Sequence, residues 1–442
     1  MTLKLHMNIG NDIGNSELDM YINGHLIRQP NVYSLIGQMP WKDDDIEVQK
    51  NLKNIYDNLV VSIISSAVPT GMYTVGTHAL KTKGENVTNL YVKGNESKSD
   101  QLVPYINTLA LVAARAVQEA YLAGESLDEV KVVADMGTAL PVKQCSPENV
   151  ATYRKKFMGE THTVTVHLGL TKKVNVSIDF DYVHVLQEGT PVTFALQMDS
   201  EGNWRTNSYE PSSEETNDLY SEFAKLYELE EVDGSYFDGK NILHVDMGDG
   251  TTDTPFTRGD AVDNDFCDGV NNGIGHALRD AIPDLLTLAP HAFNSVTRQQ
   301  YSEILKTQYT PRKHKFLNEA IQAFNPHCEN QTTQIVHHVN DQVFKIGPNE
   351  IDVVVVYGGG SILTRSIIFD KLKEMCDKTR IQLFYVPAKY AVTLNAEGLD
   401  YFVRSEIYAH LKKNYMSSAE YTAVSGKNNA AQKKKTNATL TT

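Results

Sequence analysis

Length, composition and charge limit what this chain can be. Its 442 residues, 41% of them hydrophobic, suffice for two globular lobes. The formal net charge of −14 repels a polyphosphate backbone, so we expect no direct DNA binding by the main body. The four cysteines lie far apart without a CxxC pair, and no segment approaches the ~20 apolar residues that span a bilayer. These features predict a soluble, intracellular protein with inert thiols and no membrane partner.

The first part of the chain has the pattern of a β-hairpin followed by a helix. A strand over 3–9 leads through a glycine-rich turn to alternating apolar residues over 18–22. The Asn23-Gly24 pair that follows is a strong hairpin signal, so a strand over 25–27 should pair back. Apolar residues at helical spacing then predict an amphipathic helix over 104–123.

The same pattern returns near the middle of the chain, after a short strand over 130–134. Ser126 and Glu129, just before that strand, could form a capping box or only a loop. The expected elements are a strand over 241–245, a glycine turn, a polar and apolar run over 251–257, and a helix over 269–282. The spacing between the two patterns suggests an ancient duplication.

The last third reads as a helical region followed by a buried strand and a helix. Thr297 and Gln300 form a predicted capping box, and the nearly continuous apolar run over 351–357 is typical of a parallel strand. A helix over 362–377 should follow, with Ser361 as its N-cap. Two stretches are expected to be peripheral, a surface excursion over 199–218 and a disordered basic tail over 425–442.

Glycine-bearing turns follow three of the apolar strands. The first contains Gly14, Asn15 and Ser16, the second contains Gly248, Asp249, Gly250, Thr251 and Thr252, and the third contains Gly358, Gly359, Gly360 and Ser361. Glycine lets backbone N–H groups approach an anion, and hydroxyls add donors, so the first two turns read as phosphate clamps. The third offers a shelf without side chains for a flat base or sugar. Each could also be an ordinary tight turn.

Two aspartates, Asp12 and Asp246, each end a strand at a clamp. Two carboxylates facing a polyphosphate would repel it unless a divalent cation lay between them, and Mg²⁺ prefers carboxylate oxygens and retained waters. The alternative is that both merely cap their turns. The sequence has no GxxxxGK[ST] loop and no GxGxxG after a strand, so the P-loop and Rossmann interpretations lose their main support.

The order of these turns resembles the phosphate 1, phosphate 2 and adenosine motifs of the superfamily that contains actin, the heat-shock 70 chaperones and the sugar kinases. The resemblance runs from about Asn8 to about Glu397. It implies an α/β, actin-like fold of two ribonuclease-H-like domains with a cleft for ATP (or GTP) and Mg²⁺ between them. The implied domains are 1–188, completed by a C-terminal helix near 398–420, and 189–397.

A local resemblance favours the ParM proteins, which form filaments that segregate bacterial plasmids. The run 183–191 resembles the ParM strand that ends at its catalytic glutamate, which would be Glu188 here. A carboxylate there could orient or deprotonate the attacking water. Gln187 is a rival for this role, and Asp253 falls at a ParM aspartate. The chain is longer than usual ParM proteins, with insertions expected around 141–180 and 199–240.

The resemblance implies a cytoplasmic bacterial ATPase whose partners are further copies of itself and an adaptor protein bound to a plasmid centromere. Alternatives remain at this stage. A chaperone would need a substrate domain after 397, and a cell-shape actin an amphipathic membrane element at a terminus. A non-polymerising ATPase or a sugar kinase, with Asp249 or Asp253 as its base, is the alternative left open.

Overall fold

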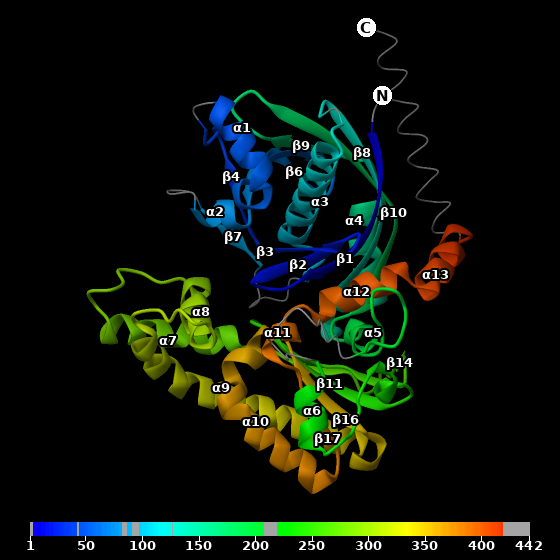
Figure 1. Ribbon diagram of the computed structural model, residues 1–442, viewed down its shortest axis with the longest axis vertical. Helices are drawn as coiled ribbons and strands as arrows, with labels where there is room; N and C mark the ends of the chain where they lie inside the picture. The colour runs from blue at the N-terminus through cyan, green and yellow to red at the C-terminus, as the bar shows by residue number, and fades with distance from the viewer. Residues whose placement is uncertain are drawn as a thin grey trace. The chain divides into compact units, whose positions relative to one another are not determined.

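The computed structural model describes residues 3–41, 44–81, 86–90, 97–125, 127–206 and 219–418. The chain divides into two compact units (Figure 1). It crosses from one unit to the other after Leu140, Lys143, Leu186 and Gly398. Unit 1 comprises residues 1–140, 144–186 and 399–442, and unit 2 comprises 141–143 and 187–398. The expected capping residue Ser126, residues 207–218 of the excursion and the basic tail lie outside the described residues.

Unit 1 is built on a sheet of ten described strands in the order β3-β2-β1-β8-β10-β9-β5-β6-β4-β7. The strands are β1 Leu3–Ile13, β2 Glu17–Ile22, β3 His25–Pro30, β4 Val32–Ile36, β5 Val60–Ser65, β6 Val68–Val75, β7 Thr88–Asn89, β8 Glu129–Leu140, β9 His162–His167 and β10 Lys173–Gln187. The helices of this unit are α1 Asp44–Lys53, α2 Thr77–Lys81, α3 Val103–Leu122, α4 Pro147–Met158 and α13 Glu406–Met416, while α12 Leu394–Arg404 begins in unit 2 and ends in unit 1.

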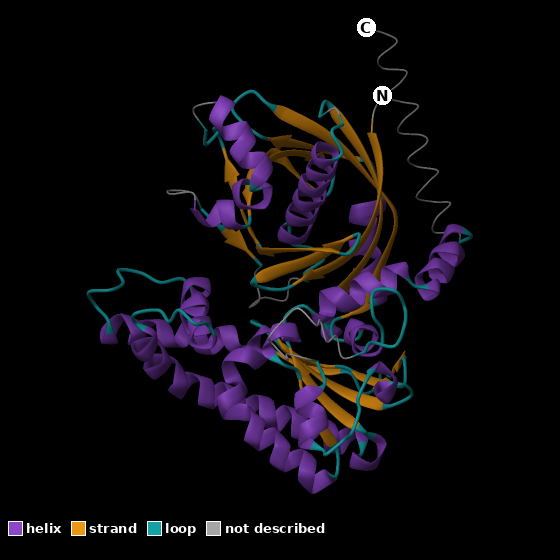
Figure 2. Cartoon of the chain, viewed as in Figure 1, coloured by secondary structure: helices purple, strands orange, loops and turns teal. Residues whose placement is uncertain are grey.

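The expected helix over 104–123 is α3, and the sheet of unit 1 curls around it (Figure 2). The sequence predicts one apolar face, but every residue from Val103 to Ala114 is buried, including Asn107 and Thr108. A helix that contacts strands from both ends of a curved sheet needs apolar residues on nearly all sides. Helix α3 is therefore the centre of the core of this unit.

The predicted hairpin at Asn23-Gly24 is confirmed. Asn23 and Gly24 have φ values of 49° and 77°, the left-handed region that a two-residue hairpin turn requires. The Asn23 side chain also accepts a hydrogen bond from the N–H of Asn8 at 2.8 Å and donates to the carbonyl of His6 at 3.1 Å. The turn thereby fixes the register of β2 on both neighbours.

Unit 2 contains a sheet in which β11, β16 and β17 run parallel and shorter antiparallel strands extend the β11 side. The strands are β11 Asn241–Met247, β12 Thr252–Thr254, β13 Phe256–Arg258, β14 Ala261–Val262, β15 Asp268–Val270, β16 Val353–Tyr357 and β17 Gln382–Tyr385. The helices are α5 Pro191–Gln197, α6 Ser221–Leu226, α7 Ile274–Leu288, α8 Arg298–Lys306, α9 Leu317–Ile346, α10 Gly359–Thr379 and α11 Ala388–Ala391.

Both faces of the parallel strands are covered, as the apolar run over 351–357 predicts. Side chains of α9 and α10 pack on one face in a single apolar cluster. Residues of α5 and of the segment around α6 pack on the other face. A further cluster joins α7, α8 and α9 into a helical layer. All five residues of β16 are buried.

Two expected helix starts in unit 2 are wrong. The helix predicted over 269–282 begins at Ile274, because Gly269 belongs to β15 and lies opposite Asp253 of β12. The helix predicted from 362 begins at Gly359 with Gly358 at the N-cap position, so Ser361 lies inside its first turn. The capping box of Thr297 and Gln300 is confirmed at the start of α8.

Candidate functional site

The first glycine turn joins β1 to β2 in unit 1. Asn31 holds it, because its side-chain Nδ2 donates to the carbonyl of Gly14 at 2.6 Å and its backbone N–H donates to the carbonyl of Ser16 at 2.9 Å. In a trans peptide the N–H of the next residue points the opposite way, so the amides of Asn15 and Glu17 face away from Asn31. Asp12 lies next to the last residue of β1, opposite Asp19.

The second glycine turn, residues 248–251, joins β11 to β12 in unit 2, and we call it the clamp loop. Its carbonyls accept hydrogen bonds from the start of α7. The N–H of Gly273 donates to the carbonyl of Gly250 at 3.1 Å, and that of Ile274 to the carbonyl of Gly248 at 3.1 Å. The N–H of Gly275 donates to the carbonyl of Asp249 at 2.7 Å. The amides of the following residues, Asp249 to Thr251, therefore point away from α7. Successive N–H groups on one side of a turn form an anion-binding concavity.

Asp246 lies in β11, just before the clamp loop. Its Oδ2 accepts a hydrogen bond from Nδ2 of Asn395, at 2.7 Å, and Asn395 is in the first turn of α12. Its Oδ1 lies against Gly358, where a Cβ atom would come within 2.7 Å of it. Asn395 could not be singled out from the sequence, because it lies 149 positions from Asp246 along the chain.

The third glycine turn is the start of α10 and lies beside the end of β11. A Cβ atom at Gly360 would come within 2.7 Å of the carbonyl of Met247, whereas one at Gly359 would meet nothing within 4 Å. Ser361, predicted as the N-cap, instead donates from its Oγ to the carbonyl of Gly358 at 2.8 Å. Because α10 is 21 residues long, its first turn adds a partial positive charge at this edge of the sheet.

Glu188, Asp246 and Asp253 are electrostatically coupled within unit 2. Asp253 lies opposite Asp246 in the strand register, and its Oδ1 accepts a hydrogen bond from the N–H of Val142 at 3.3 Å. Burial raises the pKa of Asp253 to about 7, and the charge of Glu188 raises it further than that of Asp246 does. A carboxyl group with a pKa near neutrality can hold or release a proton at working pH.

The backbone after Glu188 is held in place by Gly189 and Tyr357. The Tyr357 hydroxyl donates to the carbonyl of Gly189 at 3.0 Å, and Gly189 has a φ of 88°. A Cβ atom there would lie 2.6 Å from Pro255, so only glycine fits. The amide of Gln187 donates to Asn264 at 2.5 Å.

The predicted residues are therefore distributed over both units. The first turn with Asp12 belongs to unit 1, and the other two turns, Glu188 and Asp253 belong to unit 2. The structure brings Asp246, the clamp loop and the third turn together at the carboxyl edge of the unit 2 sheet. Among the described residues, no three His, Cys, Asp or Glu side chains are grouped as metal ligands.

Two of the four cysteines, Cys328 and Cys376, lie within α9 and α10. Cys328 and Cys376 are buried, and burial raises the pKa of each thiol to about 12. In the part of the chain that the structure describes, no helix is long and apolar enough to cross a membrane.

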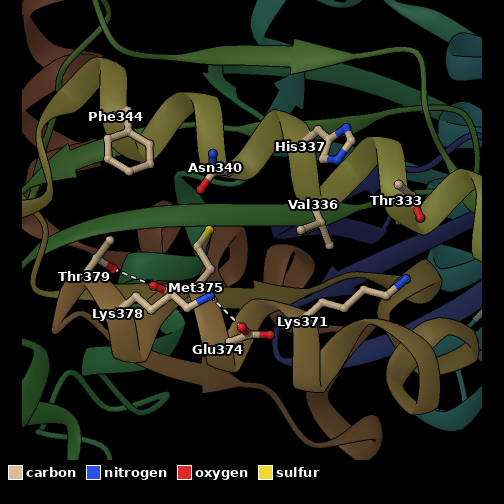
Figure 3. A pocket seen from close by; sticks show the side chains of 10 residues that line it. All are labelled: Thr333, Val336, His337, Asn340, Phe344, Lys371, Glu374, Met375, Lys378 and Thr379. Carbon is tan, nitrogen blue, oxygen red and sulfur yellow. Dashed lines mark hydrogen bonds and ion pairs between the residues drawn. The ribbon is translucent and has the colours of Figure 1, made fainter.

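A hollow between α9 and α10 lies apart from the predicted site residues (Figure 3). The α9 side chains Thr333, Val336, His337, Asn340 and Phe344 line one side, and the α10 side chains Lys371, Glu374, Met375, Lys378 and Thr379 line the other. Glu374 and Lys378 form an ion pair there at 2.6 Å. None of the residues that the sequence singled out lines this hollow.

Comparison with known proteins gives matches to solved structures alone. No family model and no curated protein matches the sequence. The crystal structure of actin-like protein Alp7A superposes with a TM-score of 0.63 at 16% identity, covering 95% of this chain and 100% of that one. The chain has the actin-like fold. Predicted from the sequence, this fold class is confirmed.

Other structures with the actin-like fold match over similar lengths. Ta0583, an archaeal actin homolog, has a TM-score of 0.56 at 14% identity, covering 90% of this chain and all of that one. ParM of Bacillus thuringiensis with ATP has a TM-score of 0.53 at 16% identity, covering 92% of this chain and 99% of that one. Identities this low establish the fold and leave the activity to be argued from the site.

Proposed function

We propose that this chain is an ATPase that binds ATP (or GTP) with Mg²⁺ and assembles into filaments with further copies of itself. One observation carries the nucleotide part: the carbonyls of the clamp loop accept hydrogen bonds from α7, so the amides of Asp249 to Thr251 turn to the opposite side. Backbone amides arranged in this way bind phosphate without a P-loop lysine. Solved neighbours described as ParM with ATP, ADP and AMPPNP support the same assignment.

Asp12 and Asp246 are the proposed magnesium ligands, either directly or through water. The hard carboxylate oxygens suit Mg²⁺, and Asn395 fixes the orientation of Asp246. A site of two carboxylates, waters and phosphate oxygens is compatible with the lack of a three-residue cluster among the described residues. When bound, the cation would neutralise phosphate charge. Gly14, Asn15 and Ser16 are proposed as the second phosphate clamp, and Gly358 to Ser361 as the adenosine shelf.

Glu188 is the proposed residue that orients or deprotonates the attacking water. Its neighbour Asp253, with a pKa near 7, can take up or return a proton in the same group of carboxylates. Gln187 is the weaker candidate, because its amide donates to Asn264. The proposal thus assigns water activation to Glu188 and proton exchange to Asp253.

The filament and its cellular role are the further part of the proposal. One solved neighbour is described as a non-polymerisable quadruple mutant of pCBH ParM, which supports self-assembly as the property to test. By the same resemblance we propose a bacterial cytoplasmic protein that segregates plasmid DNA through an adaptor bound to a centromere. The proposed domains are 1–188 with 398–420, and 189–397, and the net charge of −14 favours an adaptor over direct DNA contact.

A sugar kinase is the alternative function, and the structure reduces the candidates for its catalytic base. Asp249, one candidate base, forms an ion pair with Arg298 at 3.0 Å and its side chain is 13% exposed, so its carboxylate is already engaged by a cation. Asp253 is the remaining candidate. A kinase would consume ATP only with a sugar present and would not scatter light when ATP is added.

The magnesium assignment is tested by Asp246→Ala. Removing this carboxylate should weaken ATP binding in the presence of Mg²⁺ by at least roughly tenfold, because phosphate charge is no longer neutralised. Isothermal titration calorimetry with and without Mg²⁺ measures the effect, and Asp370→Ala, which removes an exposed aspartate of α10, is the control. If Asp246→Ala binds Mg-ATP as the wild type does, Asp246 is not part of the site.

A further inference from the structure

Arg298 has no part in the proposed mechanism, and its guanidinium contacts the clamp loop. Its Nη2 lies 3.0 Å from Oδ2 of Asp249, and the two side chains are 18% and 13% exposed. A pair so sheltered from solvent is screened little by salt, so the guanidinium strongly affects the local potential.

The position of Asp249 is fixed by two glycines at the start of α7. A Cβ atom at Gly275 would come within 2.4 Å of Oδ1 of Asp249, and one at Gly273 within 2.3 Å of its carbonyl oxygen. Any larger residue at either position would push the loop away from α7. The carboxylate of Asp249 is therefore held between Gly275 on one side and Arg298 on the other.

The position of Arg298 is fixed just as firmly, because it is the first residue of a doubly capped helix. The Thr297 side chain accepts from the N–H of Gln300 at 3.2 Å, and the Gln300 side chain accepts from the N–H of Thr297 at 2.9 Å. Val296 and Tyr301, which flank this box, are buried in the cluster of α7, α8 and α9, an arrangement that sets the entry angle of a helix. The start of α8 thus holds the guanidinium at the loop.

The charge at this edge explains why a cation is needed. Asp249 belongs to the same loop whose amides turn to the side opposite α7, and Asp246, Asp253 and Glu188 are near one another in the same unit. A further carboxylate without compensation would repel a polyphosphate, because like charges at close range repel each other strongly. An ion pair at Asp249 removes that repulsion while keeping the carboxylate as an anchor for the loop.

We propose that Arg298 is a positioning residue of the phosphate clamp: it holds Asp249 and cancels its charge, so that the loop can accept a polyphosphate. This inference rests on the proposed nucleotide binding. It has a specific consequence, because a charge effect grows with the number of phosphates on the ligand. A merely structural ion pair, which only attaches α8 to the loop, would affect ATP, ADP and adenosine alike.

The test uses Arg298→Gln in the full-length chain, with ATP, ADP and adenosine as calorimetric probes in Mg²⁺ buffer. We expect ATP affinity to fall by at least roughly tenfold, ADP affinity by less, and adenosine affinity hardly at all. The double variant Arg298→Gln/Asp249→Asn should regain most of the ATP affinity, because no uncompensated carboxylate remains. Arg298→Lys keeps the positive charge but loses the planar guanidinium, so its ATP affinity should lie between those of the wild type and Arg298→Gln.

The control is Arg279→Gln in α7, which removes an arginine whose partner Asp280 is half exposed. It should leave all three affinities unchanged. The inference is overturned if Arg298→Gln binds ATP as the wild type does, if the three ligands lose affinity in step, or if the double variant is no better than the single one. If Arg298→Gln does not fold, the affinities for ATP, ADP and adenosine are compared in Arg298→Lys and in the double variant instead. A wild type that binds no ATP contradicts the proposed function itself.

Discussion

Gly358 and Gly360 lie against the end of β11 with no room for a Cβ atom, whereas Gly359 between them faces open space. The structural requirement for glycine therefore differs among the three positions. The outer two are required by packing on Asp246 and Met247. Packing of the chain on itself does not require a glycine at 359, which is consistent with a ligand lying there.

Gly359→Val is the residue-scale prediction that follows. The added side chain should weaken ATP binding by roughly tenfold or more, because it occupies the proposed adenosine shelf, while the melting temperature should stay within a few degrees of the wild type. Calorimetry and thermal melts measure the two quantities. Gly360→Ala is the matched comparison and should lower the melting temperature, since its Cβ would lie 2.7 Å from a backbone carbonyl. If both variants lose stability and affinity together, the third turn is structural.

At the scale of elements, the two halves repeat one strand pairing. Asp12 lies opposite Asp19 between β1 and β2, and Asp246 lies opposite Asp253 between β11 and β12. The surroundings of the second aspartate differ between the two pairs. Asp19 is paired with Arg28 at 2.6 Å, whereas burial raises the pKa of Asp253 to about 7. The repeat supports the duplication that the sequence suggests, with proton exchange assigned to the second half only.

Local signals in the sequence predicted the elements that local chemistry decides. The Asn23-Gly24 turn, the capping box at Thr297 and the buried strand at 353–357 are all present. Helix starts at glycine turns were wrong, because packing on β11 lets α10 begin at Gly359. Asn395 and Arg298 could not be found, since each acts through a partner distant in sequence that only the folded chain brings close.

Strand β10 carries His184, and burial lowers the pKa of this histidine to about 4, with the charge of Arg154 adding to the effect. In the unfolded chain His184 becomes protonated near pH 6.5, whereas in the folded chain it becomes protonated only near pH 4. Stability contributed by the neutral form is therefore complete above pH 6.5 and is lost as the pH falls to 4, by up to roughly 3 kcal/mol.

His184→Gln should flatten this part of the pH dependence. Between pH 6.5 and 4 the free energy of unfolding, measured by urea titration, should fall less steeply in the variant than in the wild type. His6→Gln, which removes an exposed histidine of the same unit, is the control. Parallel curves for the wild type and His184→Gln would show that His184 does not carry the effect.

At the scale of the whole molecule, each unit has its own sheet and its own core, and the candidate residues come from both. In the proposed function, the glycine turns and the two aspartates Asp12 and Asp246 bind the nucleotide and its cation. Glu188 alone acts on the attacking water. This division predicts that binding, hydrolysis and assembly can be separated by single substitutions. A ligand that binds the assembling conformation more tightly favours assembly, and loss of the γ-phosphate removes that preference.

The most direct test of the account records light scattering and phosphate release together after Mg-ATP is added to the wild type and to Glu188→Ala. The account predicts that wild-type scattering rises and then decays as phosphate is released. Glu188→Ala should assemble equally well, release phosphate roughly 10²-fold more slowly, and stay assembled. Wild-type phosphate release and decay in Glu188→Ala would contradict the role of Glu188, and the absence of any ATP-dependent scattering from the wild type would contradict the filament itself.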